Sequence, residues 1–586
     1  MNCARSAAKL LFSCAAPFLV ACGMSPFALQ DKQMFSSSGV AADSSGVVDD
    51  WTHHHVIFSN PGTMEDAINN DSYEKWRSIV TDPRYRMQWI KRYGASSEEA
   101  ERDRFRLPRG PRRREPSLWK IDSGYWSVQI AGGSNSATAI DMYPAKFTFS
   151  VTGAPSCTDF VVFPISGAGQ ASQQGNIVGL NNLYSGTCSS NPPSWLFNYF
   201  VGTGKVQTSP VLSENGAKVA FVESITGGSK FHVVTIGTTG TNGSAFNSPV
   251  APCTVNGTNS CSTNNAVDNY IVMSGGVSVT RSSPFVDYTN DIAYVGDDSG
   301  KLHKFTPVFQ GTPAEVTTGG WPFTVAAGII LTGPVYDGGT STHIFVGGSN
   351  GNLYCVTSAG AHCSTSSVAV TTGTPSAVLD APIVDSTNER VFAEASNATN
   401  SYLMQATTAL GTVRRASMGV KGTDLYNGMF DNAYFTSVGT GHMYFCGNLT
   451  TAATPTLWRV GFASSGAMDT TNDGNSFQLV QSGHTGTAND CTPLTEIYNG
   501  TTDYLFVGVK DNGNPAGCNG NTCIMSFVIT SSFPSSANAV TTQGLGAAGT
   551  SGMVIDNVSG MTGASQVYFG NLQGNDAVQM SQSGLN

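Results

Sequence analysis

Charged residues are scarce in this chain of 586 residues. Asp, Glu, Lys and Arg together make up 12% of it, about half of the ~25% that is usual for soluble domains. Apolar residues still reach 40%, which excludes the class of disordered chains with low hydrophobicity and high charge. Glycine is abundant, with 66 residues, and supplies the positive φ that tight turns need. This composition predicts many short strands joined by turns.

Several motifs that carry catalytic chemistry are also missing. The sequence has no GxSxG elbow, no HExxH and no phosphate-binding loop. It has no CxxC, and no cysteine stands near a histidine at zinc-finger spacing. Metal binding through thiolates is therefore not expected, and no catalytic residue is predicted.

The charge that is present is unevenly placed. Residues 1–120 carry a net charge of +3, and the rest of the chain carries −13. The acidic body argues against nucleic acid or anionic lipid as a partner of the main domain. Seven arginines lie between positions 102 and 114, broken by Pro and Gly, which predicts an exposed linker over residues 101–120. A contact with an anionic surface, such as lipid head groups or a cell-wall polymer, is the alternative.

The first residues have the pattern of an export signal. Arg5 and Lys9 precede a mostly apolar run of twelve residues, which is too short to span a bilayer and has the length of a secretory h-region. The run ends in Leu-Val-Ala-Cys-Gly, which resembles the bacterial lipobox, where cleavage precedes a lipid-modified cysteine. The resemblance implies a signal peptide over residues 1–21, lipidation of Cys22, and a place at the outer membrane, cell surface or periplasm. An ordinary signal peptide is the alternative.

The remaining cysteines agree with export. Ten cysteines follow Cys22, and an even number in an exported chain indicates disulfides. The sequence does not fix their connectivity, and pairing between neighbours is our hypothesis. The pairs would be Cys157–Cys188, Cys253–Cys261, Cys355–Cys363, Cys446–Cys491 and Cys518–Cys523.

A flexible tether is predicted over residues 22–50, which are small and polar, and a small helical segment over residues 51–100. Thr63 and Asp66 form a capping-box pattern at the start of one helix. Pro83 has the position of a first helical residue in another.

Three adjacent histidines stand at the start of the helical segment. His53 and His55 would share one face of an extended segment, as metal ligands often do. The favoured alternative is that they are surface or interface residues, because the sequence places no further ligand beside them. His53 and His55 are kept as a candidate metal site.

A four-residue pattern returns along the rest of the chain: Pro or a substitute, two apolar residues, and a turn former. The copies are Pro210–Ser213, Pro284–Asp287, Pro334–Asp337, Pro382–Asp385, Ala433–Thr436, Glu496–Asn499 and Met553–Asp556. The side chain at the fourth position can accept backbone N–H groups two residues on and stabilise a turn. Further strand-like runs follow each copy, and the starts lie 74, 50, 48, 51, 63 and 57 residues apart. Four-stranded units at this period are typical of propeller blades.

An additional blade is expected upstream, where four strand-like runs lie between residues 145 and 201. The last copy lacks a fourth strand, which residues 125–132 could supply to close the ring. The predicted fold is therefore all-β: an eight-bladed β-propeller over residues 121–586, preceded by the helical segment. Seven blades are the alternative number, and a series of β-sandwiches is the weaker alternative fold.

Two copies, AYVGDDSGKLHKF and IFVGGSNGNLYCV, resemble the repeat of pyrroloquinoline-quinone-type propellers. The whole chain is also similar to a group of bacterial secreted propeller proteins that brings no activity with it. The first family implies two functions. One is a quinoprotein dehydrogenase that oxidises alcohols or sugars with pyrroloquinoline quinone, calcium and an Asp base in the central channel. The other is a lipid-anchored outer-membrane scaffold without catalysis.

The residues favour the scaffold. Those enzymes often carry an adjacent cysteine pair and a tryptophan in most blades, whereas this chain has no such pair and few blade tryptophans. Four histidines fall at the expected starts or ends of strands and are interpreted as structural: His232, His303, His343 and His442. With no cofactor predicted, we expect an exported, lipid-anchored module that binds an unidentified envelope protein or glycan. A quinoprotein dehydrogenase is the alternative function.

Overall fold

The computed structural model describes residues 46–93 and, with gaps, residues 126–581. The described ranges are 46–93, 126–132, 138–149, 156–184, 188, 193–238, 242–255, 261, 265–275, 279–339, 341–421, 424–450, 454–482, 490–514, 518, 522–541, 549–556 and 566–581. The expected signal peptide, Cys22 and the Arg-rich linker lie outside them. Among the described residues, no helix is long and apolar enough to cross a membrane.

The described strands form seven sheets. The first contains β1 (Val47–Asp49), β4 (Ala145–Thr148), β5 (Phe160–Pro164), β6 (Ile177–Asn181) and β7 (Ser194–Tyr199). The second contains β8 (Val211–Leu212), β9 (Lys218–Ile225), β10 (Gly228–Thr235), β11 (Cys253–Thr254) and β12 (Val267–Val272). The third contains β13 (Phe285–Asp287), β14 (Ile292–Gly296), β15 (Lys301–Phe305) and β16 (Phe323–Thr324). The fourth contains β17 (Val335–Asp337), β18 (His343–Gly347), β19 (Asn352–Thr357) and β20 (His362–Ala369).

The fifth sheet is longer and holds two consecutive four-stranded units. One unit is β21 (Ile383–Asp385), β22 (Arg390–Ser396), β23 (Asn400–Thr407) and β24 (Val413–Val420), with β2 (Val56–Ile57) at its edge. The other is β25 (Met429–Phe430), β26 (His442–Asn448), β27 (Pro455–Gly461) and β28 (Ser476–Gln478). The sixth sheet contains β29 (Thr495–Tyr498), β30 (Asp503–Val509), β31 (Cys523–Val528) and β32 (Asn538–Thr541). The seventh contains β33 (Val554–Asp556), β34 (Gln566–Gly570), β35 (Asp576–Ser581) and β3 (Trp126–Gln129).

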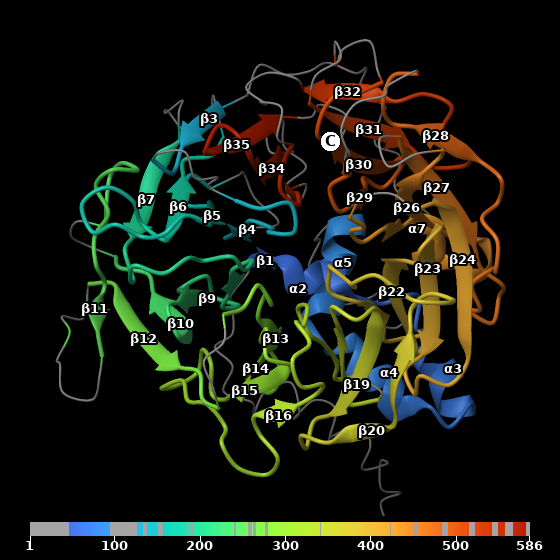
Figure 1. The fold of residues 1–586 in the computed structure, drawn as a ribbon, viewed down its shortest axis with the longest axis horizontal. Coiled ribbons are helices and arrows are strands. Elements are labelled where there is room, and N and C mark those ends of the chain that lie inside the picture. Colours follow the sequence, from blue (N-terminus) through green and yellow to red (C-terminus); the bar gives the residue numbers. More distant parts are fainter. Residues whose placement is uncertain are drawn as a thin grey trace, which may run out of the picture. The chain divides into compact units, whose positions relative to one another are not determined.

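These sheets stand around a common axis in the part of the chain from residue 45 onward (Figure 1). The inner strand of one sheet contacts the inner strand of the next, as β13 contacts β17 and β17 contacts β21. The last inner strand, β33, contacts the first, β4. Neighbouring sheets cover each other's apolar faces in this arrangement, which is a β-propeller.

The turn formers of the repeat act as the sequence predicts. Asp287 Oδ1 accepts hydrogen bonds from the backbone N–H groups of Thr289 and Asn290 at 3.1 and 3.3 Å. Asp385 makes the equivalent contacts in its own turn, and so does Asn499. A short side chain that binds local backbone amides ends each inner strand and reverses the chain.

The prediction of one copy of the repeat, Ala433–Thr436, is wrong. Residues 433–436 were expected to form an inner strand, but they belong to helix α7 (Asn432–Thr436), which a short 3₁₀ helix, η1 (Val438–Thr440), follows. The inner strand is β25, five residues upstream of the expected apolar pair, and Asp431 takes the turn-forming position. Its Oδ1 accepts the N–H of Tyr434 at 3.0 Å and so caps α7.

The first and last sheets are joined directly. The strand expected at residues 125–132 is β3, which pairs antiparallel with β35 and brings Trp126 opposite Gln579. Deeper in the ring, Lys146 Nζ on β4 lies 2.8 Å from Asp556 Oδ2 on β33, and both side chains are buried. A buried ion pair of this kind is costly to break from one side, so it holds the two ends of the ring in register.

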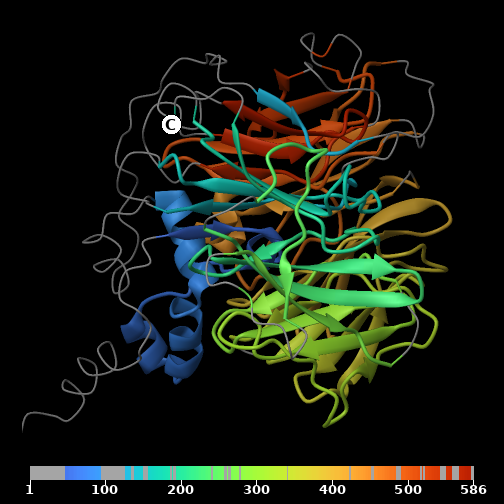
Figure 2. The same ribbon diagram turned by 90° about the vertical axis from the view of Figure 1, so that its left-hand side faces the viewer.

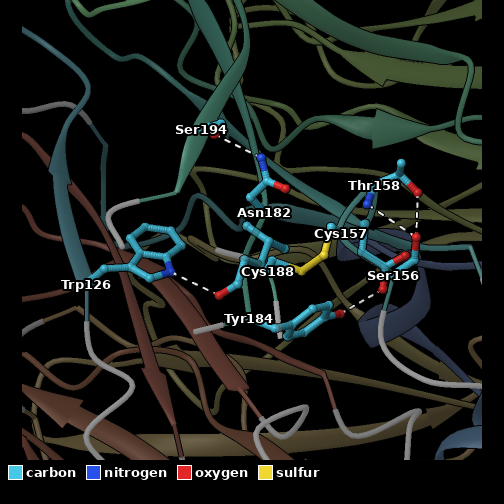
Figure 3. Close-up of a disulfide and its surroundings, with 10 residues drawn as sticks. Trp126, Ser156, Cys157, Thr158, Asn182, Tyr184, Cys188 and Ser194 are labelled. Atoms are coloured by element: carbon cyan, nitrogen blue, oxygen red, sulfur yellow. Dashed lines mark hydrogen bonds between the residues drawn. A yellow bond between two sulfur atoms is a disulfide. The ribbon is translucent and has the colours of Figure 1, made fainter. Parts of the chain in front are cut away.

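Five disulfides join the pairs that neighbour pairing predicts. Figure 3 shows Cys157–Cys188, where Trp126 Nε1 donates to the carbonyl oxygen of Leu183 at 3.4 Å. This disulfide therefore stands beside the closing strand β3. Several disulfides in one chain are typical of an oxidising, extracytoplasmic environment.

Residues 46–57 are part of the propeller, because both of their strands pair with its sheets. β1 pairs antiparallel with β4, and β2 pairs parallel with β21. The tether was expected to run to residue 50, but Val47–Asp49 is a buried strand because it extends the first sheet at its inner edge. Helix α2 (Trp51–His55) connects the two strands and lies near the middle of the ring (Figure 1).

The remaining helices are α3 (Met64–Asn69), α4 (Tyr73–Val80) and α5 (Pro83–Tyr93), and they lie on one side of the ring (Figure 2). The predicted capping box of Thr63 and Asp66 is confirmed at the start of α3, and Pro83 begins α5 as predicted. Arg92 of α5 pairs with Glu496 of β29 through two hydrogen bonds and stacks on Phe435. The helices are thus fixed to the turns at which the inner strands end.

Candidate functional site

A cavity of about 500 Å³ lies on the propeller axis. Helix α2 contributes Trp51 and His55 to it, and the loops that precede the inner strands contribute most of the rest. The lining residues used below are Trp51, His55, Asp141, Tyr143, Ser209, Arg281, Ser283, Asp298, Ile330, Leu331, Thr332, Val378, Leu379, Asp380, Asp424 and Tyr426. A volume of this size suits a small ligand or one inserted side chain.

Helix α2 forms the closed end of the cavity. Asp50 caps it by accepting the N–H of Thr52, and the other oxygen of Asp50 accepts the N–H of Leu212 at 3.0 Å. Trp51 is buried, and its Nε1 donates to the carbonyl oxygen of Pro284 at 2.7 Å. These contacts reach two different sheets, so α2 fastens the inner strands to one another.

The cavity opens on the side opposite the helices α3–α5. The inner strands begin at the cavity and end at the turns that α4 and α5 touch; for example, Ser78 of α4 donates to Gly339. Exposed apolar side chains stand around the open end, including Ile330 at 49% exposure and Leu379 at 36%. The two ends of the central channel therefore differ. Helix α2 closes one end, and the other end is open and partly apolar.

The cavity is acidic. Asp141, Asp298, Asp380 and Asp424 line it together with Arg281. Burial raises the pKa of Asp380 to about 7, and the negative charge of Asp141 adds to the shift. Burial also raises the pKa of Asp141 and of Asp424. The lining therefore gathers carboxyl groups in a partly desolvated space, where burial favours their protonated forms.

Asp380 has a second carboxylate beside it. Asp380 Oδ2 accepts the N–H of Asn427 at 3.2 Å, and Glu394 Oε1 accepts the N–H of Gly428 at 2.8 Å. Successive amides of one segment thus hold the two carboxylates next to each other, just after the cavity residue Tyr426. Glu394 is 4% exposed, and its Oε2 has no hydrogen-bond partner among the described residues. Burial raises the pKa of Glu394 to about 8, and Asp380 contributes to the shift.

This pair replaces a feature that other sheets share. In five of them, a Ser or Thr hydroxyl just before the inner strand accepts a backbone N–H from the second strand. The pairs are Thr208–Val222, Ser282–Gly296, Thr332–Gly347, Thr492–Gly508 and Ser551–Gly570. Ile383 pairs with Phe392 in the fifth sheet, as Val335 pairs with Phe345 in the fourth. Two residues further along these second strands, Glu394 therefore occupies the position that Gly347 has in the fourth sheet. Asp380, two residues before Pro382, takes the hydroxyl position.

Sequence reasoning missed Asp380 and Glu394, although a signal for them exists. Aligning the copies of the repeat beyond four residues sets Asp380 against serine and threonine, and Glu394 against glycine. A Cβ at Gly347 would lie 2.5 Å from Val378, so the repeat favours a residue without a side chain there. A buried glutamate in that position is a departure that the fold does not require.

The candidate metal ligands are placed differently from expectation. The segment is helical, so the extended geometry assumed for His53 and His55 is wrong, and residues two apart on a helix do not face each other. His53 Nδ1 lies 2.9 Å from Asp50, whereas His55 Nδ1 lies 3.3 Å from the carbonyl oxygen of Pro382. Burial lowers the pKa of His55 to about 3, so its imidazole stands neutral at the cavity.

The repeat resembles that of proteins that bind pyrroloquinoline quinone and calcium, and the fit of this cavity can be tested. Within the described residues, the group of three potential ligand atoms that lie within 4.8 Å of one another is His343, Cys355 and Cys363. These cysteines form a disulfide, and none of the three lines the cavity. Among the described residues, the cavity carboxylates do not form a group of three ligand atoms within 4.8 Å of one another, and Trp51 is part of the cavity wall. The described residues therefore do not fit this cofactor and its ion.

Two buried groups outside the cavity each combine a histidine with two carboxylates. His232 lies between Asp268 and Glu223, at 2.9 and 3.3 Å, and His303 lies between Glu315 and Asp297 on the next sheet. Both histidines are in the middle of strands, not at strand ends as predicted. The hydrogen bonds hold neighbouring strands and loops together, which supports the structural role that was predicted.

Replacing His232 with glutamine is expected to destabilise the protein in a pH-dependent way. Burial alone would lower the pKa of His232, but Asp268 and Glu223 raise it from 6.5 to about 9. The stabilisation is complete below about pH 6.5 and is lost as the pH rises through about 9. The variant should therefore lose about 3 kcal/mol more at pH 6 than at pH 9.5. Urea unfolding at both pH values measures this, and an equal loss at both would contradict it.

Comparison with known proteins adds little. No protein-family model and no curated protein matches the sequence. Among solved structures, BamB from Moraxella catarrhalis overlays with a TM-score of 0.40 at 11% identity, covering 79% of this chain and 100% of its own. Saccharomyces cerevisiae Sqt1 gives 0.45 at 9% identity, covering 78% and 100%, and the Dos1 propeller gives 0.45 at 10%, covering 79% and 95%. Because these TM-scores are below 0.5, no functional argument rests on them.

Proposed function

We propose that the chain is an exported lipoprotein, anchored through Cys22, whose eight-bladed propeller binds an envelope protein or glycan and performs no catalysis. The eight four-stranded units among the described strands support the blade number. The five disulfides support export. The lipobox resemblance and the likeness of two copies to the pyrroloquinoline-quinone-type repeat support an envelope scaffold.

The observation that carries the binding function is the asymmetry of the channel. Helix α2 and the helices after it occupy one end, so a partner can reach the axis through the other. That end combines a cavity with exposed apolar side chains, as binding surfaces often do.

The cavity hydroxyls support binding over catalysis. Ser209 Oγ accepts the N–H of Tyr143 at 2.8 Å, and Ser283 Oγ accepts the N–H of Ser209 at 2.8 Å. Thr332 Oγ1 accepts the N–H of Gly347 at 2.9 Å. Each of these three hydroxyls accepts a backbone N–H, and among the described residues none of the three is hydrogen-bonded to a carboxylate or a histidine, whereas an activated nucleophile requires a general base.

A photo-crosslinking residue at Ile330 is expected to capture a defined envelope component in intact cells. The same residue at Ile68 is the matched control, because Ile68 is also exposed, at 58%, but lies on α3 on the opposite side of the ring. The product is identified by mass spectrometry as protein or glycan. Products that form equally from both positions, or from neither, would contradict binding at the open end.

A further inference from the structure

We propose that the axial cavity binds an alkylammonium group, the cation at the end of an aliphatic chain, as carried by free diamines and by lysine side chains. This inference rests on the proposed binding function and names a ligand class for it.

The charge of the cavity is strongly unbalanced. Four aspartates line it, and Arg281 is the one cationic side chain among its lining residues. Arg281 is exposed at the open end, while Asp380 lies deeper, bonded to the N–H groups of Ala381 and Asn427. A low-dielectric cleft lined by one sign of charge concentrates ligands of the other sign. The inner part of the cavity therefore selects a cation.

A second, buried carboxylate lies beside Asp380. Glu394 is almost completely buried, and its Oε2 has no hydrogen-bond partner among the described residues. Leaving a buried acceptor without a donor is unfavourable. Glu394 is not among the residues that line the cavity, whereas its neighbour Asp380 is, so an ammonium bound at Asp380 would be attracted by the charge of Glu394 behind it. The fold retains this unfavourable carboxylate at a position where four other sheets have glycine, and such departures are concentrated at functional sites.

The arrangement suits an ammonium better than a metal ion. A divalent cation needs several oxygen ligands at about 2–2.6 Å, and so a cluster that converges on one point. The carboxylates of the cavity form no such cluster within the described residues. An ammonium has three donors directed outward, and a diamine carries a second charge that can reach Asp298 or Asp424 nearer the opening.

The rest of the wall accommodates an aliphatic chain. Leu331 and Val378 are buried apolar residues of the lining, and the burial of methylene groups against such residues is favourable. Trp51 and Tyr426 present aromatic rings, on which an ammonium is attracted to the π face. A small inorganic cation would use none of this surface, so the lining favours an organic amine.

The protonation of the carboxylates makes binding depend on pH. The titratable or charged groups that face Asp380 and Glu394 are Asp141, Tyr143, His55, Asp298, Arg281, Asp424 and Tyr426. His55 is neutral because burial lowers its pKa, and burial raises the pKa of both tyrosines. Asp380 and Glu394 gain negative charge between about pH 7 and 8, so affinity should rise from pH 6 to pH 8.5.

Calorimetric titration of the full-length protein with cadaverine tests the proposal. We expect one molecule bound per chain at pH 8, and at least a tenfold rise in Kd for Glu394→Gln and for Asp380→Asn. The control Glu65→Gln removes an exposed carboxylate on α3 and should leave Kd unchanged. 1-Pentanol, which has the same chain without the charge, should not bind. Proton release on binding, measured in two buffers, should accompany it.

The two sources of the ammonium are separated by a second probe. Tighter binding of cadaverine than of Nα-acetyl-lysine amide indicates a free diamine, and the reverse indicates a lysine side chain of a partner. No heat with either probe, or equal Kd for wild type and Glu394→Gln, overturns the proposal. Crosslinking from Ile330 is independent of this result, so a captured partner without amine binding overturns the inference alone.

Discussion

Replacing Trp51 with alanine is expected to lower the free energy of unfolding by about 3–5 kcal/mol, the cost typical of a deleted buried tryptophan. Trp51 is 2% exposed and packs edge-on against Phe285 of β13 and His55. Its Cη2 lies 2.9 Å from where a Cβ of Gly333 would be, so the neighbouring loop is shaped to admit the ring. Urea unfolding monitored by circular dichroism measures the loss.

Trp51→Phe separates packing from hydrogen bonding. It keeps an aromatic ring but loses the bond to Pro284, so we expect a smaller cost, of which about 1 kcal/mol belongs to the bond. Trp89→Ala on α5 is the control, because Trp89 is only half-buried and its removal should cost less. A loss below about 1 kcal/mol for Trp51→Ala would mean that α2 contributes little to the stability of the ring.

The strands of the propeller could be predicted because their signals are local. Each inner strand needs apolar residues that face its neighbours and a turn former at its end, and Asp287 and Asp385 show the same backbone bonds in two sheets. The same local rule misplaced residues 433–436. The window ending at Asp431 and the window ending at Thr436 both fit it, and only the capping of α7 by Asp431 decides between them.

The path of the N-terminal segment could not be predicted from local signals. β1 has three residues and β2 has two, and both are strands because they pair with the distant inner strands β4 and β21. His53 and His55 belong to a helix of five residues, which is too short to form alone. Contacts of Asp50 and Trp51 with the propeller decide its conformation, and a sequence window does not contain those partners.

The cavity could be predicted from the sequence only in part. Its lining comes from loops of the repeat, so its position follows from the fold, but its chemistry comes from residues that depart from the repeat. Asp380 and Glu394 break the pattern of hydroxyl and glycine that four other sheets use. Their adjacency depends on the amides of Asn427 and Gly428 in the loop before β25, in the second unit of the fifth sheet. Only the register of the strands shows that the two positions are neighbours.

Replacing Glu394 with glutamine is expected to stabilise the protein at high pH by about 5 kcal/mol relative to the wild type. Burial raises the pKa of Glu394 from 4.5 to about 8, so the folded state keeps a proton that the unfolded state has already lost. The stability of the wild type therefore falls as the pH rises between about 4.5 and 8. Glutamine is close in shape to the protonated acid and carries no titrating group, so this loss disappears.

Urea unfolding at pH 5, 7 and 9 measures the difference between the two proteins. At pH 5 they should be nearly equal, because Glu394 is protonated in the folded wild type, and the difference should grow to its full value by pH 9. Glu65→Gln, at an exposed position, should follow the wild type throughout. Parallel curves for Glu394→Gln and wild type would contradict a buried, proton-holding glutamate. A gain in stability together with weaker cadaverine binding would mean that the fold keeps a destabilising carboxylate because its ligand needs it.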